Sequence, residues 1–162
     1  MPAFRTTRNV VWRADQMFAL VADVEAYPQF LPLCLGLRVR KRSVDAEGRE
    51  VIVADMEVGY QAIRETFTSK VTLDRGAGKI LVEYVDGPFS RLENRWTFRD
   101  TGTEAAPRCS VEFDIDYAFR SRTLGMIVGA VFDRAFRKFS EAFETRAREV
   151  YGREKRATLA AS

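Results

Sequence analysis

Few residues of this sequence form the combinations that enzymes use for catalysis. The chain has no histidine, which removes the usual Ser–His–Asp and Cys–His pairs, acid–base catalysis by imidazole, and most zinc and iron site types. Its two cysteines, Cys34 and Cys109, lie far apart, and we expect both to be small buried hydrophobic residues. An enzyme would need Glu65, Asp55 or a tyrosine as its acid or base, with a shifted pKa. No paired-carboxylate or nucleophile motif accompanies them, so we predict a binding protein rather than an enzyme.

Four polar residues are expected on the inward faces of β-strands: Glu65, Tyr84, Asn94 and Tyr117. In the alternating pattern of residues 62–74, Glu65 shares a face with Phe67. In the same way, Asn94 shares a face with Trp96. Burying a polar group without a partner costs about 1–3 kcal/mol, so these groups must bond one another, hold water or face a ligand. The alternatives are a satisfied core network, or a bulge that turns Glu65 outward.

The strands that carry these residues belong to a long antiparallel series. We predict a strand over residues 3–12 and a helix over 14–27. Six more strands follow, over residues 35–44, 49–58, 62–74, 79–87, 90–100 and 108–119. Apolar residues at helical spacing then predict one long helix over 123–151, with Gly152 placed to stop it. This order indicates an α+β fold, in which a twisted sheet curls around the last helix and leaves a cavity.

Length, charge and hydropathy narrow the class of protein. The 162 residues suit one domain, and the net charge of +3 is too small to indicate nucleic acid by itself. The basic stretch RVRKR, residues 38–42, and the tail after Gly152 are expected to be solvated, with a phosphate or ribosomal contact as the alternative. No apolar run approaches the ~18 residues of a membrane-spanning helix, and the start lacks the order of a secretory signal. We therefore expect a soluble, cytoplasmic protein, at most peripheral at the inner face of the membrane, that binds no DNA.

Several spaced stretches of the chain resemble one known family. They are QMFALVADVEAYPQFLPLC, FTSKVTL, DGPFSRLENRWTF, and VEFDIDYAF followed by a long helix that ends in RAREVYG. In this order they are similar to the coenzyme-Q-binding proteins of the START-like, helix-grip superfamily, also described as polyketide cyclase/dehydrase-like. The resemblance covers about residues 3–152, which is nearly the whole chain.

The resemblance implies a fold and a ligand. The fold would be a seven-stranded antiparallel sheet wrapped around a long C-terminal helix, with two short helices after the first strand. It would form one START-like domain over residues 1–152, followed by a flexible basic tail over 153–162. The tunnel between sheet and helix would hold ubiquinone or a similar lipid, with no covalent cofactor, and the protein would act as a carrier that supports respiratory electron transport. The family also includes a bacterial ribosome-association toxin, so binding to the large ribosomal subunit is the alternative.

In such a fold the connection after the first helix would lie at the mouth of the tunnel. Connections are usually polar and run over the surface, but this one carries Tyr27, Phe30, Leu31 and Leu33. Pro28 and Pro32 end the helix, permit at most a short second one, and would make the segment stiff. These residues would form a lip that shields the opening or makes a transient membrane contact. The alternative is that they only cap the core.

The expected tunnel wall combines strand and helix residues. On the strands the candidates are Glu65, Phe67, Tyr84, Phe89, Asn94, Trp96 and Tyr117, and on the helix they are Met126, Ile127, Ala130 and Val131. The helix start is apolar nearly all round, and Gly125 and Gly129 would let a flat ligand or a neighbouring chain approach closely. Packing of this helix on the sheet is the alternative. A quinone head offers oxygen acceptors, which suit donors such as the Asn94 amide and tyrosine hydroxyls.

Overall fold

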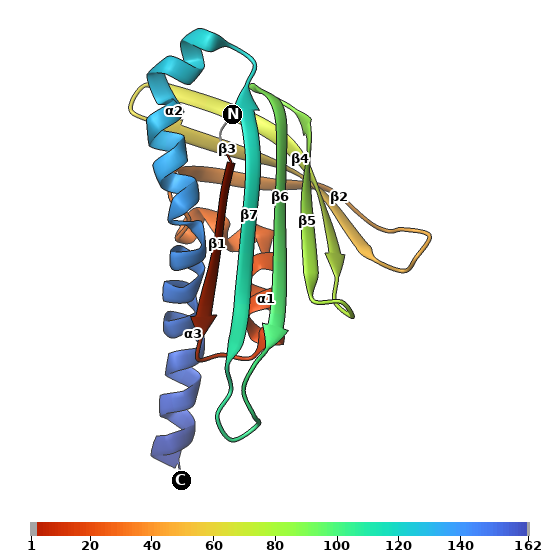
Figure 1. Ribbon diagram of the computed structural model, residues 1–162, viewed down its shortest axis with the longest axis vertical. Helices are drawn as coiled ribbons and strands as arrows, with labels where there is room; N and C mark the ends of the chain where they lie inside the picture. Colours follow the sequence, from red (N-terminus) through yellow and green to blue (C-terminus); the bar gives the residue numbers. More distant parts are fainter. Residues whose placement is uncertain (1–2, 162) are drawn as a thin grey trace.

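The strands of the molecule form one antiparallel sheet that curves around its helices (Figure 1). The computed structural model describes residues 3–161, with side chains up to Gly152. The strands are β1 (Ala3–Val10), β2 (Cys34–Val44), β3 (Glu50–Tyr60), β4 (Ile63–Asp74), β5 (Lys79–Asp86), β6 (Phe89–Asp100) and β7 (Cys109–Phe119). The helices are α1 (Ala14–Ala22), the short 3-10 helix η1 (Val24–Gln29), α2 (Arg122–Arg137) and α3 (Phe139–Ala161).

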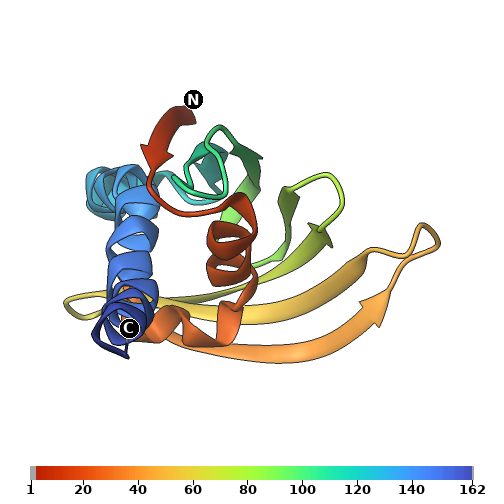
Figure 2. The same ribbon diagram turned by 90° about the horizontal axis from the view of Figure 1, so that it is seen from below.

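The sheet leaves one face for the helices. Its seven strands lie in the order β1-β7-β6-β5-β4-β3-β2, so β1 and β2 form its two edges. Figure 2 shows the helices together on the concave side of the sheet, with α1 surrounded by the curving strands. This arrangement confirms the predicted α+β, helix-grip fold, including two short helices between the first two strands.

Strand β6 shows how the sequence pattern creates one buried face. Leu92, Asn94 and Trp96 are buried, whereas Glu93 and Arg95 between them are exposed. The neighbouring β7 repeats the alternation along its length. This pattern is typical of an antiparallel sheet with a core on one side and water on the other, and it was predicted from the sequence.

Ion pairs between neighbouring strands cover part of the outer face of the sheet. They include Arg5–Asp114 at 2.9 Å, Arg91–Asp116 at 2.8 Å and Arg99–Glu112 at 2.7 Å. Each pair joins oppositely charged side chains on adjacent strands, an arrangement that favours the observed pairing. Exposed pairs of this kind contribute only about 0–1 kcal/mol each, but they neutralise much of the local charge.

The edge strand β2 carries the basic stretch of residues 38–42. Its pairing with β3 shifts register twice, between Cys34 and Gly36 and between Val39 and Lys41. Two of its arginines are paired with carboxylates, Arg40 with Asp55 at 3.4 Å and Arg42 with Glu25 at 2.7 Å. The stretch is thus solvated, as predicted, and partly neutralised.

The first helical segment is shorter than predicted, because the chain changes helix type. The α-helix α1 ends at Ala22, and η1 continues from Val24 as a 3-10 helix that includes Pro28. Met17 and Phe18 of α1 are buried against the concave side. This short second helix sets the direction in which the apolar connection enters β2.

The C-terminal helix consists of two segments rather than the single one predicted. The first, α2, begins after Ser121, whose Oγ accepts a hydrogen bond from the Leu124 N–H at 3.2 Å. Lys138, with φ −97° and ψ −1°, separates α2 from α3. Within the described residues, no helix is both long and apolar enough to cross a membrane.

The helix end predicted at Gly152 is wrong, because α3 continues to Ala161. Glycine ends a helix where it adopts a positive φ, and Gly152 does not adopt one. The flexible basic tail was predicted over residues 153–162, whose side chains lie outside the described part of the chain. The domain division at residue 152 therefore stays a prediction.

Candidate ligand-binding cavity

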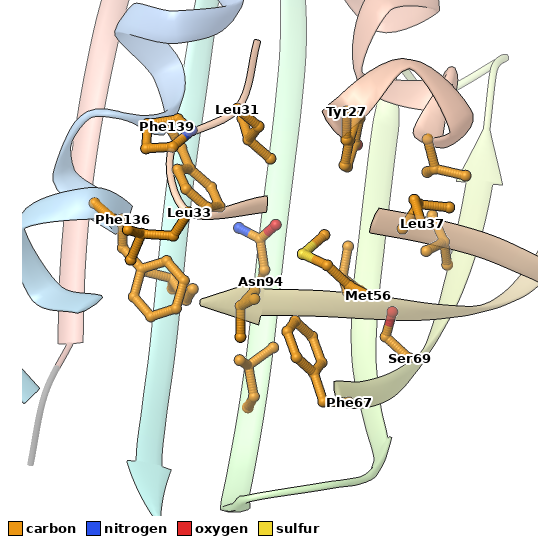
Figure 3. Close-up of a pocket in the computed structure, with 18 of the residues that line it drawn as sticks. Tyr27, Leu31, Leu33, Leu37, Met56, Phe67, Ser69, Asn94, Phe136 and Phe139 are labelled. Carbon is orange, nitrogen blue, oxygen red and sulfur yellow. The ribbon is translucent and has the colours of Figure 1, made fainter. Parts of the chain in front are cut away.

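A cavity lies between the concave face of the sheet and the helical segments that cover it (Figure 3). Strands β2 to β7 form its floor, η1 and the following loop form one side, and α2 with the start of α3 forms another. Its volume is about 60 Å³, counted as the space open to the centre of a water molecule. One water needs about 10–15 Å³ by this measure. The cavity is therefore narrow, and the wide tunnel that the resemblance implied is not open in this structure.

The lining of the cavity is almost entirely apolar. The side chains labelled in Figure 3 are Tyr27, Leu31, Leu33, Leu37, Met56, Phe67, Ser69, Asn94, Phe136 and Phe139. Among the described residues that line the cavity, none is charged. Glu65 and Asp55, the carboxylates considered for catalysis, both lie outside the lining. The cavity thus suits an apolar ligand that is bound mainly through buried area.

Asn94 belongs to a hydrogen-bond network at the cavity wall. Its Nδ2 donates to the backbone oxygen of Asp114 at 2.9 Å, and its Oδ1 accepts from Nε1 of Trp96 at 2.8 Å. Among the described residues, no fully buried side-chain nitrogen or oxygen lacks a partner. The core network proposed as the alternative role of Asn94 is therefore present, and it fixes both Asn94 and Trp96 in place.

Ser69 is the polar residue of the lining that remains available. It is only 6% exposed and lies on β4, between Ala54 of β3 and Tyr84 of β5. Its hydroxyl forms no hydrogen bond with any described residue, and it borders the cavity instead of being enclosed by protein. A hydroxyl in this position can donate to or accept from a molecule in the cavity.

The predicted lip residues divide between the cavity and the core. Tyr27, Leu31 and Pro32 line the cavity, whereas Phe30 does not. The ring of Phe30 packs edge-on against Phe143 of α3, with their centroids 5.1 Å apart. The core-capping alternative therefore holds for Phe30, whereas a lip that shields the opening or contacts a membrane stays a prediction.

The hydroxyl of Tyr27 is committed to the protein. It donates to the backbone oxygen of Val21. Burial raises its pKa, and the nearby Cys34 and Asp23 raise it further. Tyr27 therefore stays neutral and contributes an aromatic wall instead of a free donor.

The other predicted strand residues, Glu65, Tyr84, Phe89 and Tyr117, lie outside the cavity lining. Glu65 is half-exposed, and no bulge occurs at its position in the pairing of β3 with β4. The Tyr84 hydroxyl accepts from the backbone N–H of Phe89 at 3.2 Å. Phe89 is fully buried and contacts the cavity residue Phe67 edge-on, at 5.4 Å between centroids.

Tyr117 points inward as predicted but faces α2. It is almost completely buried, and its pKa is raised to about 12, mainly by burial. The carboxylate of Asp133 on α2 contributes to this increase, and Arg137 opposes it. The hydroxyl thus joins β7 to α2 next to the cavity.

The predicted helix residues do not line the cavity, and this prediction is wrong for a geometric reason. Met126 and Ile127 are 86% and 61% exposed, Ala130 is exposed, and Val131 is half-buried. The buried face of α2 instead presents its residues from the next turns to the cavity: Phe132, Ala135 and Phe136. Because the start of α2 is apolar nearly all round, its sequence does not indicate which side is buried.

Several lining residues were missed at the sequence level. Leu37 and Met56 continue the inward alternation of β2 and β3, so the pattern itself could have identified them. Phe136 and Phe139 are among the apolar residues at helical spacing that predicted the C-terminal helix, but they were not assigned to the cavity wall. Leu33 was expected in the lip and lines the cavity, but its left-handed φ of 65°, which is uncommon for a non-glycine residue, has no signal in the sequence.

The turn between β5 and β6 packs tightly behind the cavity wall. Gly87 has a φ of 141°, and a Cβ at this position would lie 2.6 Å from Cβ of Phe67. Only glycine combines this backbone conformation with so close an approach. The turn therefore holds Phe67 against the cavity.

The family model described as "Polyketide cyclase / dehydrase and lipid transport" matches residues 12–144. The chain belongs to this family. The polyketide cyclase/dehydrase and lipid transport family includes, by its description, both enzymes and lipid carriers, and it confirms the resemblance found in the sequence.

Relatives within this family carry two kinds of name. The Ribosome association toxin RatA of Escherichia coli (strain K12) is 36% identical over 151 residues, which cover 93% of this chain and 90% of that protein. The mitochondrial Coenzyme Q-binding protein COQ10 homolog B of Xenopus laevis is 27% identical over 141 residues, covering 86% of this chain and 55% of that protein. The solved structure of the 18 kDa protein CC1736 from Caulobacter crescentus is 37% identical, has a TM-score of 0.73, and is matched over 94% of this chain and 99% of that one.

Proposed function

We propose that this protein binds an isoprenoid quinone, or a lipid of similar shape, in the cavity and carries it in support of respiratory electron transport. The observation that supports this most is the lining, which is uncharged and contains one available hydroxyl, that of Ser69. An enclosed apolar site with few polar groups suits a ligand recognised by shape and area. The description of the family as including lipid transport, and the name of the COQ10 relative, agree with such a ligand.

The cavity has to widen before it can hold a quinone ring. Its volume is about 60 Å³, whereas an engineered apolar cavity that binds benzene has about 150 Å³. Leu33, Leu37 and Met56 line the cavity and are partly exposed, so they have room to move. Methionine in particular adapts its shape easily. We expect a ligand to displace these side chains on entering.

Within the widened cavity the quinone head would lie near Ser69. A quinone carbonyl oxygen would accept a hydrogen bond from Oγ of this residue. The isoprenoid tail would run along the apolar lining, where burial contributes about 25 cal/mol per Å². Affinity is therefore expected to rise with tail length until the cavity is full, and equal affinity for quinone analogues of graded length would contradict the proposal.

The direct test is mass spectrometry of an organic extract of the purified protein. We expect a copurified quinone or related lipid from the wild type. Met56→Trp fills the cavity and is expected to remove that ligand, while the matched variant Val85→Trp, at an exposed position on β5, is expected to retain it. The proposal fails if the wild-type extract contains no such lipid and the protein binds no quinone analogue.

A second candidate function is binding to the large ribosomal subunit. It is favoured by the 36% identity to a relative named as a ribosome association toxin. Cosedimentation with large subunits at increasing salt would test it, because contacts to RNA phosphates weaken steeply with salt. Part of the basic stretch on β2 is already paired with Asp55 and Glu25, so we expect little contribution from it.

A further inference from the structure

One side of the helix α2 is exposed and has an unusual composition for a protein surface. Residues three or four apart place one set of side chains on this face: Thr123, Met126, Ile127, Ala130, Arg134 and Lys138. Met126 is 86% exposed and Ile127 is 61% exposed. Single exposed hydrophobic residues are ordinary, but here two large ones are adjacent, with Ala130 one turn further along.

This face is not required for packing in the described part of the chain. The opposite side of α2 provides the residues that contact the core, namely Val128, Phe132, Ala135 and Phe136. The helix is thus apolar on two opposite sides, of which one is buried and one has no described partner. We call the exposed side, residues 123, 126, 127, 130, 134 and 138, the outer face of α2.

Unpaired positive charges lie at both ends of the apolar patch. Arg120 and Arg122 precede it, and Arg134 and Lys138 follow it. None of the four forms an ion pair with another described residue, in contrast to many arginines on the outer face of the sheet. The only acidic residue in the segment 120–138, Asp133, is held by Arg137 at 2.9 Å.

We propose that the outer face of α2 docks on the surface of an anionic phospholipid bilayer. A helix with an apolar strip flanked by cations lies in the interface of such a membrane, with its apolar side chains below the headgroups. Each arginine or lysine near an anionic surface raises binding about fivefold. A nucleic acid would satisfy the cations but not Met126 and Ile127, which offer no hydrogen bonds, so the centre of the patch favours lipid.

The position of the patch connects docking to the cavity. Phe132 and Phe136 line the cavity from the opposite side of the same helix. With α2 on the membrane, the cavity wall would lie about one helix diameter, roughly 10 Å, from the bilayer. The purpose of docking rests on the proposed function, since a membrane is where an isoprenoid lipid would be collected, but docking itself can be measured without any ligand.

The test is cosedimentation of the protein with vesicles. Phosphatidylcholine vesicles with and without phosphatidylglycerol serve as the two surfaces. We expect the wild type to bind the anionic vesicles, with binding reduced by added salt and weak on phosphatidylcholine alone. The double variant Met126→Asp/Ile127→Asp is expected to lower the partition coefficient at least about tenfold, since it replaces two inserted side chains with charges that the surface repels.

A matched double variant controls for charge and folding. Val44→Asp/Val85→Asp adds the same charge at two exposed positions on β2 and β5, and is expected to change partitioning less than about fivefold, through general electrostatics alone. Thermal unfolding of both variants checks that they are folded. The proposal is overturned if the wild type does not bind anionic vesicles or if both double variants lose vesicle binding equally. It is also overturned if the patch variant, Met126→Asp/Ile127→Asp, keeps its binding to vesicles but loses binding to large ribosomal subunits.

Docking and ligand binding can fail separately. A short-tailed, water-soluble quinone measures the cavity without a membrane, and the patch variant is expected to bind it with wild-type affinity. Vesicle binding without quinone binding would support the docking proposal and refute the proposed function. Quinone binding without vesicle binding would support the proposed function and refute the docking proposal.

Discussion

Ser69 and Asn94 border the same cavity, but their hydrogen bonds give them different roles. Asn94 is fixed by Asp114 on one side and Trp96 on the other. Ser69 has no bonded partner among the described residues. A satisfied buried group contributes to stability, whereas an available one can contribute to ligand recognition. Each role leads to a separate measurement.

Replacing Ser69 with alanine should weaken quinone binding without affecting the fold. One lost hydrogen bond corresponds to about fivefold in affinity. Quenching of Trp96 fluorescence measures binding, in a Trp12→Phe background that removes the other tryptophan. Ser43→Ala, at an exposed position on β2, serves as the control, and equal affinities for the two variants would exclude the proposed contact.

Replacing Asn94 with alanine should reduce stability. The indole N–H of Trp96 would lose its acceptor inside the core, and the free energy of unfolding should fall by about 2–3 kcal/mol. Urea unfolding measures this loss, and exposed Asn9→Ala should change stability by less than about 0.5 kcal/mol. If the network carries the effect, the loss should shrink in a Trp96→Phe background; an unchanged loss would contradict this explanation.

At the residue scale, the sequence predicted best where side chains alternate. Phe67, Asn94 and Trp96 were assigned to the inner face of their strands, and all three line the cavity. Met126 and Ile127 were assigned to the cavity and are exposed. A strand with polar and apolar residues in alternation has a defined phase, but a helix that is apolar nearly all round has none.

At the scale of elements, the C-terminal helix shows what local sequence does and does not specify. Its existence and its start followed from the change to helical periodicity at residue 123. The interruption at Lys138 and the continuation past Gly152 did not follow. Gly152 keeps a φ compatible with a helix, and glycine inside a helix costs only about 1 kcal/mol relative to alanine, so its presence does not by itself end the helix.

The turn between β5 and β6 gives a prediction for an element. Gly87→Ala would place a Cβ 2.6 Å from Cβ of Phe67, at a φ of 141°, and should cost about 2–4 kcal/mol of stability. Gly48→Ala is the matched control, because its φ is also positive, at 80°, but a Cβ there meets nothing within 4 Å. It should cost only about 1 kcal/mol. Equal losses in thermal or urea unfolding would mean that the contact with Phe67 is unimportant.

For the whole molecule, the buried thiols and tyrosines predict how stability depends on pH. Burial raises the pKa of Cys34 from its ordinary 9.0 to about 11, and that of Cys109 from 9.0 to about 12. Burial likewise raises the pKa of Tyr117 from 10.0 to about 12. The folded state therefore holds these protons more tightly than the unfolded state, so their contribution is complete below pH 9.0 and is lost as the pH rises toward 12.

Urea unfolding over a pH series measures this dependence. Because the chain has no histidine, we expect little change between about pH 6 and 8, followed by a decline above pH 9.0. The double variant Cys34→Ala/Cys109→Ala should move the onset of the decline to higher pH. Constant stability up to pH 11 would contradict the predicted burial effect.

The overall architecture was predictable, but the size of the cavity was not. The order of strands and helices, together with the spaced stretches of the family, indicated the sheet, its helices and a space between them. The volume of about 60 Å³ depends on the side-chain conformations of residues such as Leu33 and Met56. Small changes in these conformations open or close the space, and a sequence pattern does not record them.

The irregular edge strand β2 has a consequence for the protein at high concentration. An open sheet presents unpaired backbone groups at its edge, and these can template the addition of strands from other molecules. The two register shifts of β2 break this row, and residues 38–42 place charged side chains along the edge, although Arg40 and Arg42 are paired with carboxylates. We therefore expect this edge of the sheet to resist pairing with a second copy of the chain.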